Sequence, residues 1–308
     1  MMALFSRTHD MPGGALQPGM DEFAEIVRRE ESLAPYTYLR IGGPAEMLAR
    51  PRSREELAGI VRACRQHNLP LRVLGSGCKV LVRDEGVRGV VLRLSEPAFT
   101  SVQIQGGRVR AGAGAALSAF ISESARHGLA GPETLVGIPG TVGGAVRCNA
   151  GDRSGEIGQL IRSMEVVDAQ GQIQVRDRDD LRFAGGWSTL DELVLLSADF
   201  ELEPDQPDAI VKRMRKAWIH RKADQPLSFE AAGRVFKNPR GLSAAALIDQ
   251  AGLARTRVGG AEISERDPNY IMAHSGASAR DVLRLIDLIH TRVRERFNVD
   301  LELDIAIW

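Results

Sequence analysis

This chain has 308 residues, which is long for one domain and predicts two or three separately packed units. Its 40 basic side chains balance 40 acidic ones, so net charge favours neither a nucleic acid nor an anionic membrane as partner. No apolar run is long enough for a membrane span or a signal peptide. We therefore expect a cytoplasmic protein without a membrane partner, favour a monomer, and interpret residues 1–30 as a flexible leader.

The cysteine content indicates a reducing compartment. Cys64, Cys78 and Cys148 are odd in number and far apart in the sequence. This spacing fits free thiols better than a disulfide framework or a zinc site, so no metal is expected.

In chain order, the apolar spacing predicts helices and short strands in mixed succession. The segment 53–68 begins with Ser53 and Glu56 in capping-box spacing and carries an apolar helical stripe. Hairpins are expected to turn at Gly106 and near Gly171. Hairpins mixed with helices indicate an α+β fold rather than a regular doubly wound sheet. The other expected elements are strands at 71–75, 89–94, 192–204 and 299–308, and helices at 116–128, 206–222 and 278–297.

Two glycine-rich loops carry most of the chemical information: "GSGCK", residues 75–79, and "GIPGTVGGAVRCNAGD", residues 137–152. The first loop lacks the third glycine of a dinucleotide fingerprint and continues as an apolar run typical of a strand, which disfavours a Rossmann site. No Gly-Lys-Ser/Thr follows either loop, which disfavours a P-loop. Each loop alone could be a tight turn between strands. Two such loops in one α+β unit favour a cradle whose backbone N–H groups bind a diphosphate.

Further motifs surround these loops in a fixed order. "LRIGGPAE" and "LGSG" come before the second loop, and "NAG" and "GEI" come at its end. "FKNP" at 236–239, "ALIDQAGL" at 246–253 and "LEL" at 301–303 continue the series to the C terminus. The series resembles the UDP-N-acetylenolpyruvoylglucosamine reductase family. The resemblance implies a flavoprotein oxidoreductase that uses FAD and NADPH to reduce an enolpyruvyl UDP-sugar in peptidoglycan precursor synthesis, within cell wall biogenesis.

The resemblance also implies an architecture. A two-lobed FAD-binding domain of the vanillyl-alcohol-oxidase (PCMH) type would span residues 31–205, with lobes at about 31–95 and 96–205, and a smaller α+β domain at 206–308 would bind the UDP-sugar. The loop glycines would let the backbone approach FAD where side chains would collide. The residues assigned in this way to FAD are Gly75, Ser76, Gly77, Cys78, Lys79, Ile138, Pro139, Gly140, Gly143, Gly144, Ala145 and Asn149, and those assigned to the substrate are Lys237, Asn238 and Arg221.

Several positions depart from the family pattern. Where the family usually has Ser-Asn after the first loop's glycines, this chain has Cys78 and Lys79. Arg234 in "GRVFKNP" stands at the family's proton-donating serine, and Gly186 in "FAGGWS" stands at its arginine, with Gly185 at the preceding tyrosine. Arginine cannot replace serine as an acid, because its high pKa keeps its protons.

Two other positions of the family's site are altered less drastically. Asp304 corresponds to the family's glutamate, a shorter carboxylate whose role is retained in our interpretation. The family's His-x-Asn-Phe reads Asp-Pro-Asn-Tyr in this chain, from Asp267 to Tyr270. Asp304 and Arg234 are therefore the candidate catalytic residues.

Two functions stay open on this basis. In one, the chain is a working reductase in which Arg234 supplies the cation lost at Gly186, and water, Ser228 or Asp304 supplies the proton. In the other, it is an FAD-binding homologue that has lost the activity, a pseudoenzyme that serves as a sensor, a partner protein or an enzyme for another substrate. Arg234 would then be a loop cation on a solvated surface.

Overall fold

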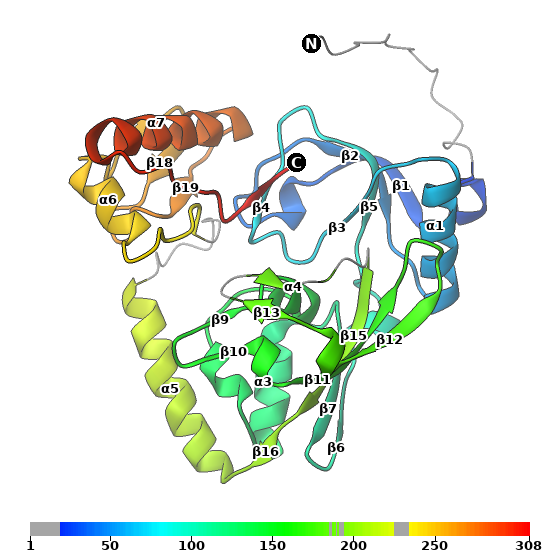
Figure 1. Ribbon diagram of the computed structural model, residues 1–308. Helices are drawn as coiled ribbons and strands as arrows, with labels where there is room; N and C mark the ends of the chain where they lie inside the picture. The colour runs from blue at the N-terminus through cyan, green and yellow to red at the C-terminus, as the bar shows by residue number, and fades with distance from the viewer. Residues whose placement is uncertain (1–18, 185–186, 189, 191–193, 225–233) are drawn as a thin grey trace.

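The computed structural model describes residues 19–184, 187–188, 190, 194–224 and 234–308. Figure 1 shows two lobes, one above the other in this view, with a C-terminal domain beside the upper lobe. We call residues 19–95 the first lobe, residues 96–224 the second lobe and residues 234–308 the C-terminal domain. The mixture of sheets and helices confirms the α+β class.

The first lobe is built on a four-stranded sheet that is covered on both faces. Its elements are η1 (Asp21–Phe23), β1 (Val27–Ser32), η2 (Ala34–Tyr36), β2 (Pro44–Ala49), α1 (Arg54–Gln66), β3 (Leu71–Val73), β4 (Val80–Leu81) and β5 (Val87–Leu92). The spatial order is β1-β2-β5-β3, with β1 antiparallel to β2 and the other pairs parallel. Alternate residues of a strand face opposite sides, so Met47 packs into the core with α1 and Leu48 into a smaller cluster behind the sheet.

The folded chain begins earlier than the predicted leader boundary at residue 30. Met20, Phe23, Ile26 and Val27 are all buried in the core of the first lobe. The strand β1 starts at Val27. Residues 19–30 therefore belong to the fold, because their apolar side chains complete this core.

The second lobe contains an antiparallel five-stranded sheet. Its elements are α2 (Pro97–Thr100), β6 (Val102–Gln105), β7 (Arg108–Gly112), α3 (Leu117–Arg126), β8 (Leu129–Ala130), η3 (Pro132–Leu135), α4 (Val142–Arg147), β9 (Gly151–Asp152), β10 (Gly155–Glu156), η4 (Ile157–Gln159), β11 (Ile161–Val167), β12 (Ile173–Asp177), η5 (Arg178–Asp180), β13 (Phe183–Ala184), β14 (Trp187–Ser188), β15 (Val194–Glu201), β16 (Glu203–Pro204) and α5 (Pro207–Asp224). The sheet order is β12-β11-β15-β7-β6. The pairs β6–β7 and β11–β12 confirm the two predicted hairpins.

Helix α5 packs against the second lobe. It contacts η3, α3 and β8, and Met214 lies against the core of this lobe. Arg213 pairs with Glu133 at 2.8 Å and with Asp205 at 2.7 Å. The predicted boundary between residues 205 and 206 therefore falls before a helix of the second lobe, and we place the boundary after Asp224 instead.

The C-terminal domain combines one long helix with a small sheet. Its elements are α6 (Ala244–Gln250), β17 (Arg257–Val258), β18 (Ala261–Ile263), β19 (Ile271–Ala273), α7 (Ala279–Phe297) and β20 (Ala306–Ile307). The capping box of Ser278 and Asp281 begins α7. Val282, Leu285 and Ile289 of its apolar stripe are buried in a core that also takes in residues of the first lobe, namely Leu39, Ile41 and Leu81.

The C-terminal tail joins this domain to the first lobe. The predicted strand at 299–308 was too long: Leu303 makes a single bridge to Phe236, and only β20 forms a ladder, parallel to β4. Trp308 extends the contact, since its N–H donates to Leu81 and its carbonyl accepts from Arg83, each at 2.9 Å. Figure 1 shows this red segment crossing to β4. Among the described helices, none is long and apolar enough to cross a membrane.

Candidate functional site

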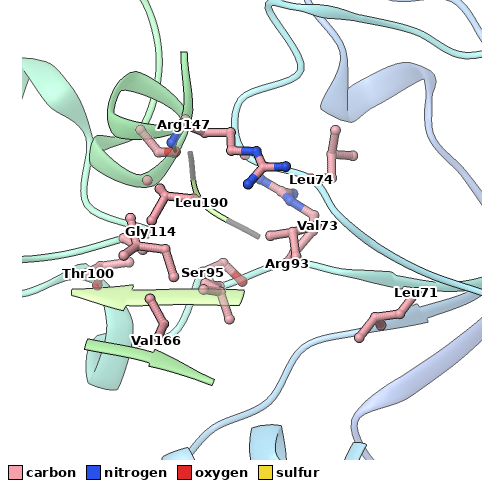
Figure 2. A pocket seen from close by; sticks show the side chains of 17 residues that line it. Leu71, Val73, Leu74, Arg93, Ser95, Thr100, Gly114, Arg147, Val166 and Leu190 are labelled. Carbon is pink, nitrogen blue, oxygen red and sulfur yellow. Dashed lines mark hydrogen bonds between the residues drawn. The ribbon is translucent and has the colours of Figure 1, made fainter. Parts of the chain in front are cut away.

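A cavity of about 530 Å³ lies between the first and second lobes. Gly75 of the first glycine loop lines it from one side, and Gly143 and Gly144 of the second loop line it from the other. Figure 2 shows the side chains that face this space. Apolar residues from both lobes form much of its wall, namely Leu71, Val73, Leu74, Leu94, Val166, Leu190 and Leu195. The structure thus brings Gly75 and Gly143, which are 68 positions apart in the sequence, to one cavity.

The two loops differ in which backbone N–H groups remain available. In the second loop, Val142 donates to Ala115 at 2.9 Å and Gly143 donates to Ala113 at 2.8 Å. Gly144 donates to the Thr141 hydroxyl at 3.2 Å, as in a helix N-cap. These three groups cannot form the anion cradle that the sequence predicts for this loop, because each already has an acceptor inside the protein.

In the first loop, the N–H groups of Gly75, Ser76, Gly77 and Lys79 donate to no acceptor within the described part of the chain. A run of free backbone N–H groups is the feature that a diphosphate requires. The predicted cradle therefore fits the first loop.

The glycines of the second loop have two different roles. A Cβ at Gly143 would lie 2.9 Å from the Ala113 carbonyl oxygen, so this glycine is required by packing within the protein. A Cβ at Gly144 would meet nothing closer than the Thr141 hydroxyl at 3.4 Å. Of these two glycines, Gly144 is the one whose lack of a side chain keeps space open in the cavity.

Two arginines that the sequence did not single out supply positive charge in the cavity. Arg93 and Arg147 both line it (Figure 2). The Arg93 guanidinium lies over the ring of Tyr36, 4.3 Å from its centroid, and its Nε is buried with no hydrogen-bond partner among the described residues. Burial and the neighbouring Arg50 both lower the pKa of Arg93, but an arginine remains a cation at neutral pH.

These features fit the diphosphate of FAD. Gly75 with its free N–H group, the open space at Gly144 and two cations line a cavity with apolar walls, which suits a ligand that is part anionic and part aromatic. Arg147 lies one helical turn after Gly144 on the same face of α4. Neither arginine was assigned to FAD from the sequence: Arg147 lies within the second glycine loop, where the glycines drew the assignment, and Arg93 lies in a predicted strand.

Other residues assigned to FAD from the sequence serve the protein itself. Asn149 is 2% exposed, and its amide donates to Glu156 at 2.6 Å and accepts the Gly158 N–H at 3.1 Å. Ala145 and Ile138 pack with the core of the second lobe. Within the described residues, none of these three lines the cavity.

The remaining assigned residues link the two loops. The Cys78 thiol donates to the Pro139 carbonyl at 3.5 Å, and burial raises the pKa of this thiol. A Cβ at Gly140 would lie in ordinary contact with Ser76 and Cys78. A Cβ at Gly77 would collide with the backbone of Tyr36 at 2.3 Å, and its φ of +71° also favours glycine. These residues shape the loops that surround the cavity.

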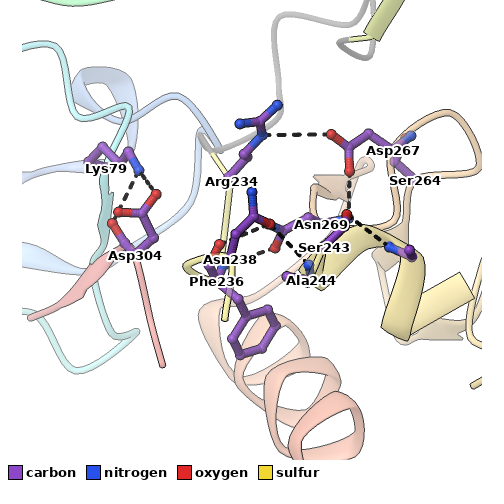
Figure 3. Close-up of polar contacts among 11 residues, drawn as sticks. Lys79, Arg234, Phe236, Asn238, Ser243, Ala244, Ser264, Asp267, Asn269 and Asp304 are labelled. Carbon is purple, nitrogen blue, oxygen red and sulfur yellow. Dashed lines mark hydrogen bonds and ion pairs between the residues drawn. The ribbon is translucent and has the colours of Figure 1, made fainter. Parts of the chain in front are cut away.

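A second group of polar residues lies where the C-terminal domain meets the first loop. Lys79 of that loop forms an ion pair with Asp304 of the tail, and its Nζ also donates to the Asp304 carbonyl at 3.3 Å. Arg234, whose side chain is half exposed, approaches Asp267 at 3.8 Å. Figure 3 shows the two pairs on either side of the segment that carries Phe236. The candidate catalytic residues Arg234 and Asp304 therefore do lie in one region.

Comparison with known proteins gives the family. The family model for the C-terminal domain of UDP-N-acetylenolpyruvoylglucosamine reductase matches residues 225–308, and that for an FAD binding domain matches residues 45–176. The UDP-N-acetylenolpyruvoylglucosamine reductase of Moorella thermoacetica is 40% identical over 96% of both chains. That of Rhodopirellula baltica is 38% identical over 94% of both. The crystal structure of the Thermus caldophilus reductase superposes with a TM-score of 0.79 at 38% identity, covering 92% of this chain and 98% of that one.

The chain belongs to the UDP-N-acetylenolpyruvoylglucosamine reductase family. The resemblance seen in the sequence is thereby confirmed, as are the FAD-binding domain of the expected type and the family's C-terminal domain. The match to the C-terminal domain begins at residue 225, directly after α5. The FAD-binding match contains all the glycines and both arginines of the cavity.

The three residues assigned to the substrate each have partners within this reductase-family structure. The Asn238 side chain accepts the Ala244 N–H at 3.0 Å and so holds the start of α6. Lys237 lies at the surface, 3.1 Å from Glu302. Arg221 contacts the second loop, donating to the Val136 carbonyl and pairing with Asp152, each at 2.5 Å. Asn238 and Arg221 are thus engaged in holding the protein together.

Three positions that matter to the family's chemistry lie outside the described residues. These are Gly185 and Gly186, at the family's tyrosine and arginine, and Ser228, a candidate proton donor from the sequence. The predictions about them stay predictions. The described part of the site offers one further acid, Tyr270, which the sequence showed only as a departure from a phenylalanine.

Proposed function

We propose that this chain is an FAD-dependent reductase that uses NADPH to reduce the enolpyruvyl group of UDP-N-acetylenolpyruvoylglucosamine, in the cytoplasm and as a monomer. The observation that carries the proposal is the cavity between the lobes, with a free N–H loop and two arginines, in a chain that matches this family along more than nine-tenths of its length.

The residues that would hold the cofactor are those of the cavity. The free N–H groups of the first loop would bind the diphosphate, Arg93 and Arg147 would neutralise it, and Gly144 would leave room for it. The chemistry that bound FAD would supply is hydride transfer between NADPH and the substrate. The protein's part is to hold the ring and substrate in contact and to exclude water, which is where much of an enzyme's rate advantage arises.

The UDP-sugar would lie between the C-terminal domain and the first loop. Arg234 and Lys237 carry half-exposed cations there, with side chains 50% and 57% exposed, which suits a diphosphate or a carboxylate of the substrate. The Lys79–Asp304 pair fixes the tail over the first loop, so that this space stays next to the cavity. Preorganised charges of this kind stabilise the negative charge that develops on the substrate.

The proposal is tested by purifying the protein with added FAD and measuring NADPH oxidation with and without the UDP-sugar. Turnover on the order of 1–10³ per second, strictly dependent on the sugar, is expected. Mass spectrometry should show a product heavier than the substrate by two hydrogen atoms. A protein that binds FAD and yields no such product would be the homologue that has lost the activity.

A further inference from the structure

The proposed reduction needs a proton as well as a hydride, and the inference below rests on that proposed function. When a hydride adds to one carbon of the enolpyruvyl double bond, the other carbon carries the electron pair and must be protonated by a placed acid. Arg234 stands at the expected position of that acid but keeps its protons. The acid must therefore be another group near Arg234.

Three chain segments meet around this point with a fixed register. Val235 donates its N–H to the Asn269 carbonyl at 2.8 Å, and its own carbonyl accepts the Asp304 N–H at 2.8 Å. The Asn269 side chain accepts the Phe236 N–H at 2.9 Å and donates to the Phe236 carbonyl at 2.8 Å. Tyr270 directly follows Asn269 in the chain. Its backbone is therefore fixed beside the segment that begins at Arg234.

The phenol of Tyr270 lies among charged groups from three parts of the chain. Arg234 and Asp267 come from the C-terminal domain, Arg221 from α5 and Asp304 from the tail, and all four act on the phenol electrostatically. The residue is 8% exposed. Burial is the largest cause that raises the pKa of Tyr270, and Asp267 and Asp304 add to the rise, so the phenol is protonated at neutral pH. Arg234, and after it Arg221, oppose the rise, so their positive charge favours the phenolate once it forms.

The other acids of this region are less suited to the step. The Asp304 side chain is already engaged in an ion pair with Lys79. The Cys78 thiol directs its proton to the Pro139 carbonyl between the two loops. Tyr270 is the described acid that combines a retained proton with a neighbouring guanidinium.

We propose that Tyr270 is the proton donor of this reduction, and that Arg234 is a positioning residue that acts through it by holding positive charge beside the phenolate. The Tyr270 O–H bond breaks as the new C–H bond forms, using the electron pair left on the substrate carbon. The hydride comes from NADPH by way of FAD, and the phenolate then takes a proton from water. The two departures, serine to Arg234 and phenylalanine to Tyr270, would thus be one coordinated change.

The first test uses Tyr270→Phe in the complete FAD-loaded protein. NADPH-reduced enzyme is mixed anaerobically with the UDP-sugar, and reoxidation of the flavin is followed by its visible absorbance. We expect reoxidation to slow by roughly 10²–10⁴-fold, while the FAD affinity and the rate of flavin reduction by NADPH stay within twofold of wild type. Ser124→Ala, which removes a buried hydroxyl from α3 that donates to the Phe120 carbonyl at 2.8 Å, serves as the control and should change neither step.

The second test separates a positioning role of Arg234 from a merely structural one. Arg234→Lys should keep most of the reoxidation rate, whereas Arg234→Gln should lose at least about tenfold. In the Tyr270→Phe background, Arg234→Gln should cost nothing more, because groups that act in one step are not additive. In the FAD-free protein, ultraviolet titration should show the Tyr270 phenol ionising at a higher pH in Arg234→Gln than in Arg234→Lys.

The outcomes distinguish this inference from the function on which it rests. If the wild-type protein never transfers electrons to the UDP-sugar, both the proposed function and this inference are overturned. If the wild type does so and Tyr270→Phe reoxidises as fast, only the role of Tyr270 is overturned. If the losses from Tyr270→Phe and Arg234→Gln simply multiply in the double variant, Arg234 does not act through Tyr270.

Discussion

At the scale of single residues, the adjacent glycines 143 and 144 give the sharpest contrast. Gly144→Val should fold and yet bind FAD at least about tenfold more weakly, about 1.4 kcal/mol, because the new side chain occupies the cavity. Gly143→Val should lower the free energy of unfolding by about 1–3 kcal/mol, because its Cβ would press on Ala113 at 2.9 Å. FAD titration by fluorescence quenching and urea unfolding of the FAD-free proteins measure the two effects.

The contrast also decides between two explanations of the loop. Equal loss of stability in both variants, with FAD affinity unchanged in Gly144→Val, would mean that both glycines serve packing alone. The loop would then be a tight turn with no space reserved for a cofactor.

The raised pKa of the buried Cys64 thiol predicts how the free energy of unfolding depends on pH. Burial raises the pKa of its thiol from 9.0 to about 11. Below pH 9 the thiol is protonated in both the folded and the unfolded chain, so it contributes no difference. Between about pH 9 and 11 the unfolded chain ionises first, so the free energy of unfolding falls, by at most about 3 kcal/mol at about 1.4 kcal/mol per pKa unit.

The measurement is urea unfolding from pH 8 to pH 11 in wild type and Cys64→Ala. The variant is expected to be less stable at every pH because of the cavity it creates, but its stability should decline less steeply above pH 9. Parallel declines in the two proteins would show that the Cys64 thiol ionises equally easily in both states.

At the scale of elements, helix α7 is capped from another part of the chain. The Asp84 carboxylate of the first lobe accepts the N–H groups of Ala279 at 2.8 Å and Arg280 at 3.0 Å. Asp84→Ala should therefore cost about 1 kcal/mol and speed hydrogen exchange in the first turn of α7. Ser278→Ala removes the helix's own cap and is the control, since it should weaken α7 without loosening the C-terminal domain from the first lobe.

The overall rate of limited proteolysis reports that loosening. Faster cleavage in Asp84→Ala than in Ser278→Ala would support a docking role for Asp84. Identical cleavage rates would confine Asp84 to the stability of the helix itself.

Elements whose signals lie within a short stretch of chain were predictable. The hairpins at Gly106 and Gly171, and α7 with its cap at Ser278, followed from periodicity and turn chemistry. The helix α4 was not predicted, because it has only six residues and two of them are glycines, which disfavour helices. The prediction of one long final strand was wrong. The tail pairs at two separate points, by a single bridge to Phe236 and then by the β20–β4 ladder.

At the scale of the whole molecule, the two lobes and the C-terminal domain followed from the resemblance to a family. The cavity's charge could not be predicted, because Arg93 and Arg147 come together only when the lobes pack. The residues of the polar group around Arg234 were expected in one site from the resemblance, but their individual partners, such as Lys79 for Asp304 and Asp267 for Arg234, are set only by the fold. Sequence spacing carries no information about such contacts.

The proposed activity passes electrons from NADPH through FAD to the enolpyruvyl UDP-sugar. The most direct measurement is the visible absorbance of the FAD-loaded protein under anaerobic conditions. NADPH alone should bleach the flavin, and one equivalent of UDP-N-acetylenolpyruvoylglucosamine should then restore its colour within seconds. A flavin that stays bleached after the UDP-sugar is added, or a protein that binds no FAD, would contradict the claim.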